Sequence, residues 1–369
     1  MENYMLPLAG ADEVGASAYF VNIDGVKILF DAGARTGGSL KFPDYVILKE
    51  VLGGYDGLDY IILSHAHYDH IGSLAFIGSC APKACILATP QTKALTALQL
   101  LDGGRIGCEG ESDVLLQAKY SQAESVMNRI LEQPVCLPHK TNRCEITFYP
   151  AGHMAGAVMT CVRTKNHCIF YTGDFSWETR SGINGIKLPG QLKPDLLILN
   201  ATKAYCTEPK CGPDEDALTG KIQGLINKFP RVLIHSSGVA KQQELLDFMR
   251  QHDFNRPVYM DAQMETVGEA LSCMGYPMGS PWMFGSASNL HVPHILLGTR
   301  GHKYGYASLN FDQYTLHATP SQLGLILKLL NPQKTLLTHT CPRGKGLPAC
   351  VEPNDHLIIQ AENGRIYNF

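Results

Sequence analysis

One stretch of the sequence concentrates side chains that could bind metal ions. LSHAHYDHIGS, residues 63–73, places His65, His67, Asp69 and His70 within six positions, directly after an apolar run. Imidazole and carboxylate groups are ligands that divalent transition metals prefer. Burying four such groups without partners would be costly, so a purely structural role for all four is a weak alternative.

The spacing of these residues predicts how they are presented. Alternate side chains share one face of an extended segment, so His65 and His67 can point in the same direction. Asp69 and His70 follow where the chain is expected to turn into a helix, which would aim them at a neighbouring second ion. The H-E-x-x-H pattern of helical zinc proteases does not occur in the sequence.

Three further candidates each stand where an apolar strand is expected to end. His153 follows a strand in YPAGHMAGAV, Asp174 ends one in CIFYTGDFS, and His339 ends one in TLLTHT. Binding and catalytic groups gather on the loops that follow a rigid scaffold. The pattern therefore predicts one site assembled from segments that are far apart in the sequence.

The motif HAHYDH resembles the H-x-H-x-D-H signature of the metallo-β-lactamase superfamily. The closer resemblance is to its β-CASP branch, the RNA- and DNA-processing nucleases that include ribonuclease J and the cleavage-and-polyadenylation endonuclease. Four other segments are similar to motifs of that branch: PLAGADEVGASAYFV, YTGDFS, RVLIHSSGVAKQQELLDFM and RPVYMDA. The resemblance covers nearly the whole chain, more tightly before residue 180 than after it.

This resemblance implies a site for two metal ions, zinc by default, with manganese or iron as alternatives. The ligands implied for the first ion are His65, His67 and His153. The ligands implied for the second ion are Asp69, His70 and His339. Asp174 would bridge the two ions, and Asp31 would orient a histidine ligand by accepting its other N–H.

The resemblance also implies the chemistry of the site. The ions would share a hydroxide that attacks phosphorus in line. His317, in YTLHATPSQL, resembles the cassette histidine of the family, which contacts a phosphate and donates a proton to the leaving oxygen. A helix starting just after His317 would direct backbone N–H groups at the same anion. The residues assigned to catalysis are therefore Asp69, Asp174 and His317.

Two features depart from the pattern of the family. Asn200 stands where relatives carry an acid that pairs with the cassette histidine, and an amide adds no negative charge. We therefore expect the pKa of His317 to be less elevated than in those relatives. The glycine-rich phosphate loop is not obvious, although TRGHKYG, with Arg300, His302 and Lys303, could contact phosphates. A solvated loop is an equally good interpretation of that segment.

Hydrophobic patterning predicts the elements that position these residues. The first 75 residues are predicted to form short strands, with a hairpin at Asp24–Gly25. Residues 89–133 are predicted to be largely helical, and strands return between 144 and 202. The following region alternates strands and helices, which indicates parallel strands with crossover helices. A last helix is predicted to be capped by Thr319.

The expected fold class is therefore α/β. Residues 1–203 and 318–369 are expected to form a metallo-β-lactamase αβ/βα sandwich, and residues 204–317 an inserted, β-CASP-like α/β cassette.

Composition narrows the class of protein. The chain has 369 residues, of which 45% are hydrophobic, and a formal net charge of −3, so nucleic acid would have to bind a local basic patch. No apolar stretch approaches 18 residues, so no membrane segment is expected. The N-terminus lacks the basic region of a secretory signal. The 12 cysteines form no C-x-x-C motif, which indicates reduced thiols in a cytoplasmic protein.

These observations predict a metallo-hydrolase, a phosphodiesterase or nuclease acting on RNA or on single-stranded DNA. One alternative is a hydrolase of a small phosphodiester, nucleotide or ester, which the acidic net charge favours. Another is a catalytically weak scaffold subunit, which Asn200 favours. Whether the chain forms a homodimer is left open.

Overall fold

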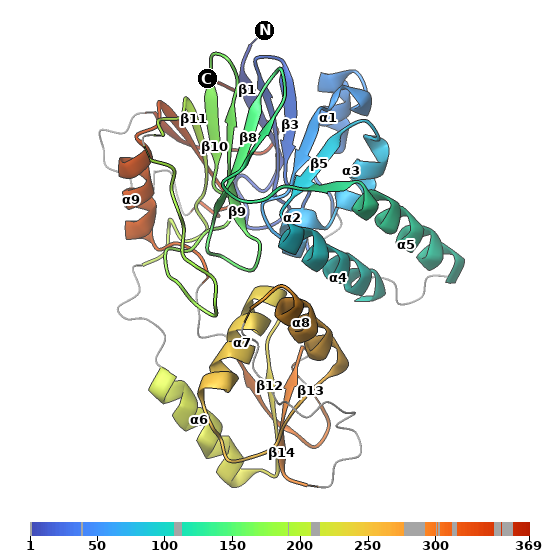
Figure 1. The fold of residues 1–369 in the computed structure, drawn as a ribbon, viewed down its shortest axis with the longest axis vertical. Helices are drawn as coiled ribbons and strands as arrows, with labels where there is room; N and C mark the ends of the chain where they lie inside the picture. The colour runs from blue at the N-terminus through green and yellow to red at the C-terminus, as the bar shows by residue number, and fades with distance from the viewer. Residues whose placement is uncertain are drawn as a thin grey trace. The chain divides into compact units, whose positions relative to one another are not determined.

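The computed structural model describes residues 2–37, 40–106, 113–190, 192–207, 215–276, 292–299, 301, 303–311, 316–342, 348 and 357–369. The chain divides into two compact units, each visible in Figure 1. The first unit comprises Met1–Glu178, Gly185–Glu208 and His317–Phe369. The second unit comprises Thr179–Asn184 and Pro209–Leu316.

Seven strands form the first sheet of the first unit, in the order β18-β1-β2-β3-β4-β5-β6. Their bounds are β1 Tyr4–Ala9, β2 Ala18–Ile23, β3 Val26–Phe30, β4 Tyr60–Ile62, β5 Cys85–Ala88, β6 Ile130–Glu132 and β18 Tyr367–Asn368. Strands β18 to β3 pair antiparallel, whereas β3 to β6 pair parallel. Parallel neighbours need crossover connections, and these are helical here.

The connecting helices lie between β3 and β6 in the chain. Their bounds are α1 Tyr45–Leu52, the 3-10 turn η1 Tyr55–Gly57, α2 Tyr68–Ile71, α3 Leu74–Cys80, α4 Pro90–Ile106 and α5 Asp113–Asn128. Helix α1 corrects the prediction that the first 75 residues form only short strands. The Asp44 carboxylate accepts hydrogen bonds from the N–H groups of Val46 and Ile47, and Gly53 ends the helix at a φ of 69°.

The hairpin predicted at Asp24–Gly25 is confirmed. Strands β2 and β3 pair antiparallel down to Ile23 and Val26, and the two turn residues have φ angles of 48° and 82°. Two-residue hairpin turns need such positive φ angles, which Asp and Gly tolerate well.

The second sheet of the first unit also has seven strands, in the order β17-β16-β11-β10-β9-β8-β7. Their bounds are β7 Pro138–Lys140, β8 Glu145–Pro150, β9 Val158–Arg163, β10 Cys168–Tyr171, β11 Leu196–Asn200, β16 Lys334–Thr338 and β17 Ile358–Gln360. Strands β10, β11, β16 and β17 run parallel. Helix α9, Pro320–Leu330, flanks this sheet and begins with the capping box of Thr319 and Gln322 (Figure 1).

The two sheets face each other across one apolar core. Buried side chains of the first sheet, such as Tyr19 and Phe30, cluster with Phe148 and Tyr171 of the second. A separate core packs the other face of the first sheet against α1, α3 and α5. The layers are therefore helix, sheet, sheet and helix, and the predicted αβ/βα sandwich of the metallo-β-lactamase fold is confirmed.

The second unit contains a four-stranded parallel sheet, in the order β13-β14-β12-β15. Its strands are β12 Arg231–His235, β13 Val258–Met260, β14 His294–Gly298 and β15 Ala307–Asn310. Its helices are α6 Glu215–Lys228, α7 Val239–Gln251 and α8 Ala262–Cys273. The parallel strands and crossover helices predicted for this region are confirmed.

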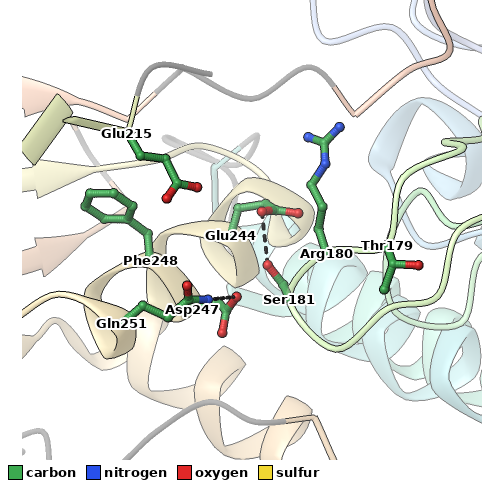
Figure 2. Close-up of a pocket in the computed structure, with 8 residues that line it drawn as sticks. All are labelled: Thr179, Arg180, Ser181, Glu215, Glu244, Asp247, Phe248 and Gln251. Carbon is green, nitrogen blue, oxygen red and sulfur yellow. Dashed lines mark hydrogen bonds between the residues drawn. The ribbon is translucent and has the colours of Figure 1, made fainter. Parts of the chain in front are cut away.

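The segment Thr179–Asn184 clusters with the second unit, although sequence patterning had placed it before the cassette. The Ser181 hydroxyl donates a hydrogen bond to the Glu244 carboxylate at 3.0 Å (Figure 2). The Gln243 amide donates to the Ser181 carbonyl at 3.2 Å. Both partners lie on α7. His317, expected at the end of the cassette, falls in the first unit.

None of the helices that the structure describes is both long and apolar enough to cross a lipid bilayer. The cysteines in the described part of the chain are free thiols.

Candidate metal centre

Strand β4 delivers the histidine-rich turn. The chain leaves the first sheet after Ile62, and α2 begins at Tyr68 with His67 as its N-cap. The turn packs closely against the loop after β3: a Cβ atom on Gly33 would lie 1.8 Å from the Asp69 carbonyl oxygen. Any larger residue at position 33 would clash with the turn, so the close packing requires glycine.

The second sheet delivers the three remaining candidates. His153 follows β8, Asp174 follows β10 and His339 follows β16. Strands β10 and β16 both run parallel to β11, so their carboxyl ends meet at one edge of the sheet. His339 has a φ of 54° and donates its backbone N–H to the Gly10 carbonyl at 2.7 Å. A positive φ outside glycine costs on the order of 1 kcal/mol and persists only where the surroundings impose it.

The first group of candidate ligands consists of His65, His67, His153 and Asp174. The Nδ1 atom of His67 lies 3.1 Å from Nε2 of His65 and 3.0 Å from Nε2 of His153. Three nitrogens bound to one tetrahedral zinc ion would be about 3.3 Å apart. The donor atoms and their spacing therefore fit a single ion.

The second group consists of Asp69, His70 and His339. The Asp69 Oδ2 and His339 Nε2 atoms are 3.2 Å apart. The Nε2 atom of His70 is buried and has no hydrogen-bond partner among the residues that the structure describes. A buried polar atom without a partner is unfavourable, and a cation at this point would satisfy it.

Asp174 lies between the two groups. Its Oδ2 atom is 3.5 Å from His70 Nε2 and 3.8 Å from the Nε2 atoms of His65 and His153. Although burial alone would raise the pKa of this carboxyl, the charge of His339 and other nearby histidines holds it well below its usual value. A fully ionised carboxylate in this position could contact an ion in each group.

The two groups differ in their electrostatics. Burial lowers the pKa of His65 well below its usual value and that of His67 to about 3, and neighbouring histidines add to the effect. Burial also acts on His70 and His339, but the charge of Asp174 outweighs it and raises the pKa of His339 to about 9. The imidazoles of the first group are therefore neutral and ready to bind a cation. In the second group His70 and His339 carry protons, which a bound cation would displace.

Asp31 anchors His70. This fully buried residue follows β3 with a φ of 58°. Its carboxylate accepts hydrogen bonds from His70 Nδ1 at 2.7 Å, from both the backbone N–H and the hydroxyl of Ser64 at 2.7 Å, and from the Tyr171 hydroxyl at 2.6 Å. With Nδ1 engaged in this way, Nε2 of His70 is left to face the site.

His317 lies beside the candidate ligands. Its Nδ1 atom is 3.6 Å from Asp174 Oδ2, and its ring centroid is 4.9 Å from that of His153. Burial lowers the pKa of His317 to about 3, so its imidazole is neutral at neutral pH. The proton-donor role expected for it therefore requires an anion in addition to Asp174, because a further negative charge nearby would raise the pKa of the imidazole.

Asn200 contacts the bridging carboxylate. Its amide nitrogen donates to Asp174 Oδ1 at 3.1 Å, and its amide oxygen accepts from the Thr338 hydroxyl at 2.9 Å. The family that the sequence resembles carries an acid at this position, which pairs with the cassette histidine. Instead, the amide holds Asp174 Oδ1, which also lies 3.2 Å from His339 Nδ1, while Oδ2 faces the other histidines.

Only one of the three residues predicted to contact the substrate, Lys303, lies within the described part of the chain. Arg300 and His302 lie outside the described residues. Lys303 belongs to the second unit, where its ammonium group stands 5.4 Å from the ring centroid of Tyr306. That cation–π contact stabilises a loop of the second unit.

Sequence reasoning missed several hydroxyl groups near the ligands, among them those of Tyr171 and Thr202. The Tyr171 hydroxyl binds Asp31, and the Thr202 hydroxyl lies 3.0 Å from His339 Nδ1. In the sequence, only their nearness to predicted site residues points to them: Tyr171 precedes Asp174 by three positions, and Thr202 follows Asn200 by two. Such a signal does not separate a positioning hydroxyl from an ordinary core residue.

A polar pocket of about 250 Å³ lies in the second unit (Figure 2). It is lined by Thr179, Arg180, Ser181, Glu215, Glu244, Asp247, Phe248 and Gln251. None of the predicted site residues lines it. Its carboxylates are engaged within the unit, for example Asp247 with Arg250 at 2.7 Å.

The fold is of the metallo-β-lactamase type. Residues 11–79 match the family model described as the metallo-beta-lactamase superfamily. The resemblance to β-CASP nucleases is confirmed by curated relatives. "Endoribonuclease ysh1" of Aspergillus fumigatus is 29% identical over 275 residues, which cover 72% of this chain and 31% of that protein.

Two other relatives have related names. "Cleavage and polyadenylation specificity factor subunit 3-II" of Arabidopsis thaliana is 26% identical over 324 residues, which cover 85% of this chain and 50% of that protein. "Integrator complex subunit 11 homolog" of Dictyostelium discoideum is 30% identical over 251 residues, or 65% of this chain and 33% of that protein. This chain thus spans half or less of the length of these relatives.

One solved structure is similar over the full length of both chains. It is the crystal structure of a protein of unknown function from Enterococcus faecalis V583, with a TM-score of 0.65 and 16% identity. At that identity, the similarity supports the fold alone.

Proposed function

We propose that this chain is a metal-dependent phosphodiesterase that hydrolyses RNA, with single-stranded DNA as a second substrate. The observation that carries the proposal is the convergence of seven imidazole and carboxylate ligands from both sheets, with His317 beside them. Relatives named as endoribonucleases support RNA as the substrate.

Two zinc ions are the proposed cofactor, with manganese or iron as alternatives. His65, His67 and His153 would hold one ion. Asp69, His70 and His339 would hold the other, with Asp174 between them. A bound pair of ions supplies a hydroxide at neutral pH and stabilises negative charge on phosphoryl oxygens.

The remaining roles belong to neighbouring side chains. Asp31 would fix the orientation of His70, and Asn200 would fix that of Asp174. His317 would contact the phosphate of the substrate, gain a proton as that anion raises its pKa, and donate the proton to the leaving oxygen. Arg300, His302 and Lys303 stay candidates for contacts with the RNA backbone.

The wider organisation is also a proposal. We assign the first unit to a metallo-β-lactamase domain and the second to a β-CASP-like cassette. We further propose a cytoplasmic location, on the basis of the free cysteines in the described part of the chain. Sedimentation velocity would decide between a monomer and a homodimer.

Cleavage of labelled single-stranded RNA tests the function. Purified protein loaded with Zn²⁺ or Mn²⁺ should shorten the RNA, and a chelator should stop the reaction. The Asp174→Asn variant, purified in parallel, should be inactive, which would exclude a contaminating nuclease. Intact RNA under all metal conditions would contradict the proposal.

Two other outcomes would favour the alternatives. Rapid turnover of bis-p-nitrophenyl phosphate with inert RNA would indicate a hydrolase of small phosphodiesters. Failure to bind any metal would indicate a scaffold subunit, because a working site of this composition should take up about two ions per chain.

A further inference from the structure

Tyr171 connects the two sheets at the candidate metal centre. It is the last residue of β10, in the second sheet, and its side chain is fully buried. Its ring packs against two aromatic residues of the first sheet. The centroid distances are 5.7 Å to Tyr19 and 5.0 Å to Phe30. The side chain therefore crosses the interface between the sheets that carry the two sets of candidate ligands.

The hydroxyl of Tyr171 ends on Asp31. It donates to Asp31 Oδ2 at 2.6 Å, and the same oxygen accepts from the Ser64 hydroxyl and from His70 Nδ1, each at 2.7 Å. Three donors around one oxygen leave that atom little freedom. The direction of the His70 ring depends on where this oxygen lies, because the Nδ1 bond to it decides where Nε2 points.

The backbone of Asp31 is strained, so its position depends on hydrogen bonds such as the one from Tyr171. Its φ of 58° is outside the range that side-chain-bearing residues usually adopt. Such a conformation persists only when neighbouring groups impose it. Among the described residues, Tyr171 makes the one side-chain hydrogen bond to Asp31 that comes from the second sheet. Ser64 lies in the connection that follows β4, and His70 lies in α2.

We propose that Tyr171 is a positioning residue for the second metal ion. Through Asp31 it holds His70 Nε2 toward the ion, and through its ring it fixes the spacing between the sheets at that point. The inference rests on the proposed two-ion site and goes beyond it, because Tyr171 contacts no candidate ligand directly among the interactions described above.

Cobalt binding to the metal-free protein tests this role. Co²⁺ reports its ligand geometry through its visible absorption, and mass spectrometry of the metal counts the bound ions. The wild-type chain should bind two ions. Tyr171→Phe should keep the first ion and bind the second about 10- to 100-fold more weakly, the usual effect of losing an outer hydrogen-bond partner.

Tyr45→Phe is the matched control. Tyr45 is also a buried tyrosine, and its hydroxyl makes a hydrogen bond of 2.6 Å, but to Ser73 rather than to Asp31. Both variants should lower the denaturation midpoint of the metal-free protein by a similar, small amount, because each loses one buried hydrogen bond. Only Tyr171→Phe should lose affinity for the second Co²⁺ ion and alter the absorption of the fully titrated protein.

The outcomes separate this inference from the proposed function. If the wild type binds no metal, the proposed function fails. If Tyr171→Phe binds both ions like the wild type, or if Tyr45→Phe weakens the second ion equally, the positioning role is wrong while the two-ion site stands. Should Tyr171→Phe not fold, Ser64→Ala removes another donor to the same Asp31 oxygen. It must then weaken the second ion for the inference to survive.

Discussion

His339 and Asp69 are separated by 270 positions in the chain, yet His339 Nε2 lies 3.2 Å from Asp69 Oδ2. Asp69 belongs to α2, which follows a strand of the first sheet, and His339 follows a strand of the second. The second candidate ion site therefore forms only when the two sheets pack together. Metal binding and the stability of the first unit should be linked.

Metal loading should stabilise the folded chain. An ion present at about 100 times its dissociation constant adds about 2.7 kcal/mol to the unfolding free energy, because it binds the folded state alone. Urea unfolding of protein with Zn²⁺, and of protein treated with a chelator, measures this difference. Asp174→Asn should show much less stabilisation. Equal midpoints for wild-type protein with and without metal would contradict the assignment.

Removing one ligand from each group should remove different ions. His67→Ala should lower the zinc content by about one ion per chain through loss of the first group, and His339→Ala by about one through loss of the second. Both should reduce RNA cleavage to background. Metal analysis after gel filtration gives the count, and crystallography of each variant would show which position is empty. Full metal content in either variant would mean that its histidine is not a ligand.

His317→Ala should separate catalysis from metal binding. The variant should keep two ions and lose about 10²-fold in turnover, the lower range for removing a general acid. Single-turnover cleavage and metal analysis on the same preparation measure both quantities. His317→Gln, which retains a hydrogen-bond donor without acid–base function, serves as the control. Loss of metal from either variant would make His317 a ligand.

Asn200→Asp should destabilise the metal-free chain. The amide now donates to Asp174 Oδ1 at 3.1 Å, and a carboxylate in its place would oppose another carboxylate in a buried site. Losing this hydrogen-bond donor should lower the unfolding free energy of the metal-free chain by about 1–3 kcal/mol. Bound cations would offset the repulsion, so zinc should stabilise Asn200→Asp more than the wild type. Denaturant unfolding with and without zinc measures the difference, and an equal zinc effect on both proteins would count against this explanation.

Glu13→Gln should reveal a pH-dependent contribution to stability. Burial opposes ionisation of Glu13, but hydrogen bonds from Arg35 and from the Gly10 backbone lower its pKa overall. The pKa of Glu13 is therefore lower in the folded chain than in the unfolded chain, where it is near 4.5. Its ionised carboxylate stabilises the fold at pH values above 4.5, and this stabilisation is lost as the pH falls through the pKa of the folded state.

The effect should be small, because both partners are partly exposed. We expect the wild type to exceed Glu13→Gln by about 0.5–1 kcal/mol at pH 7 in low salt, and by less at pH 3.5. Urea unfolding of chelator-treated protein at both pH values measures it. A difference that grows as the pH falls would show that the sign is wrong.

Some of the fold was accessible from local sequence patterns. The Asp24–Gly25 turn and the alternating strands and helices of the second unit depend on residues close in sequence. Helix α1 was missed because its identity rests on the Asp44 cap and on burial of one face. The clustering of residues 179–184 with the second unit depends on contacts such as that of Ser181 with Glu244, 63 positions further along the chain.

The sequence by itself determined which residue types stand where strands end, from His65 to His339, and thus the chemistry available to the site. The tertiary structure alone decided the contacts that orient them: Tyr171 with Asp31, Thr202 with His339 and Asn200 with Asp174. The physical reason is that sequence patterns act between neighbouring residues, whereas these contacts join distant segments. Strand and turn patterns extend over a few residues, whereas a hydrogen bond requires two atoms about 3 Å apart. Between segments distant in the chain, only the packing of the two sheets brings atoms to that distance.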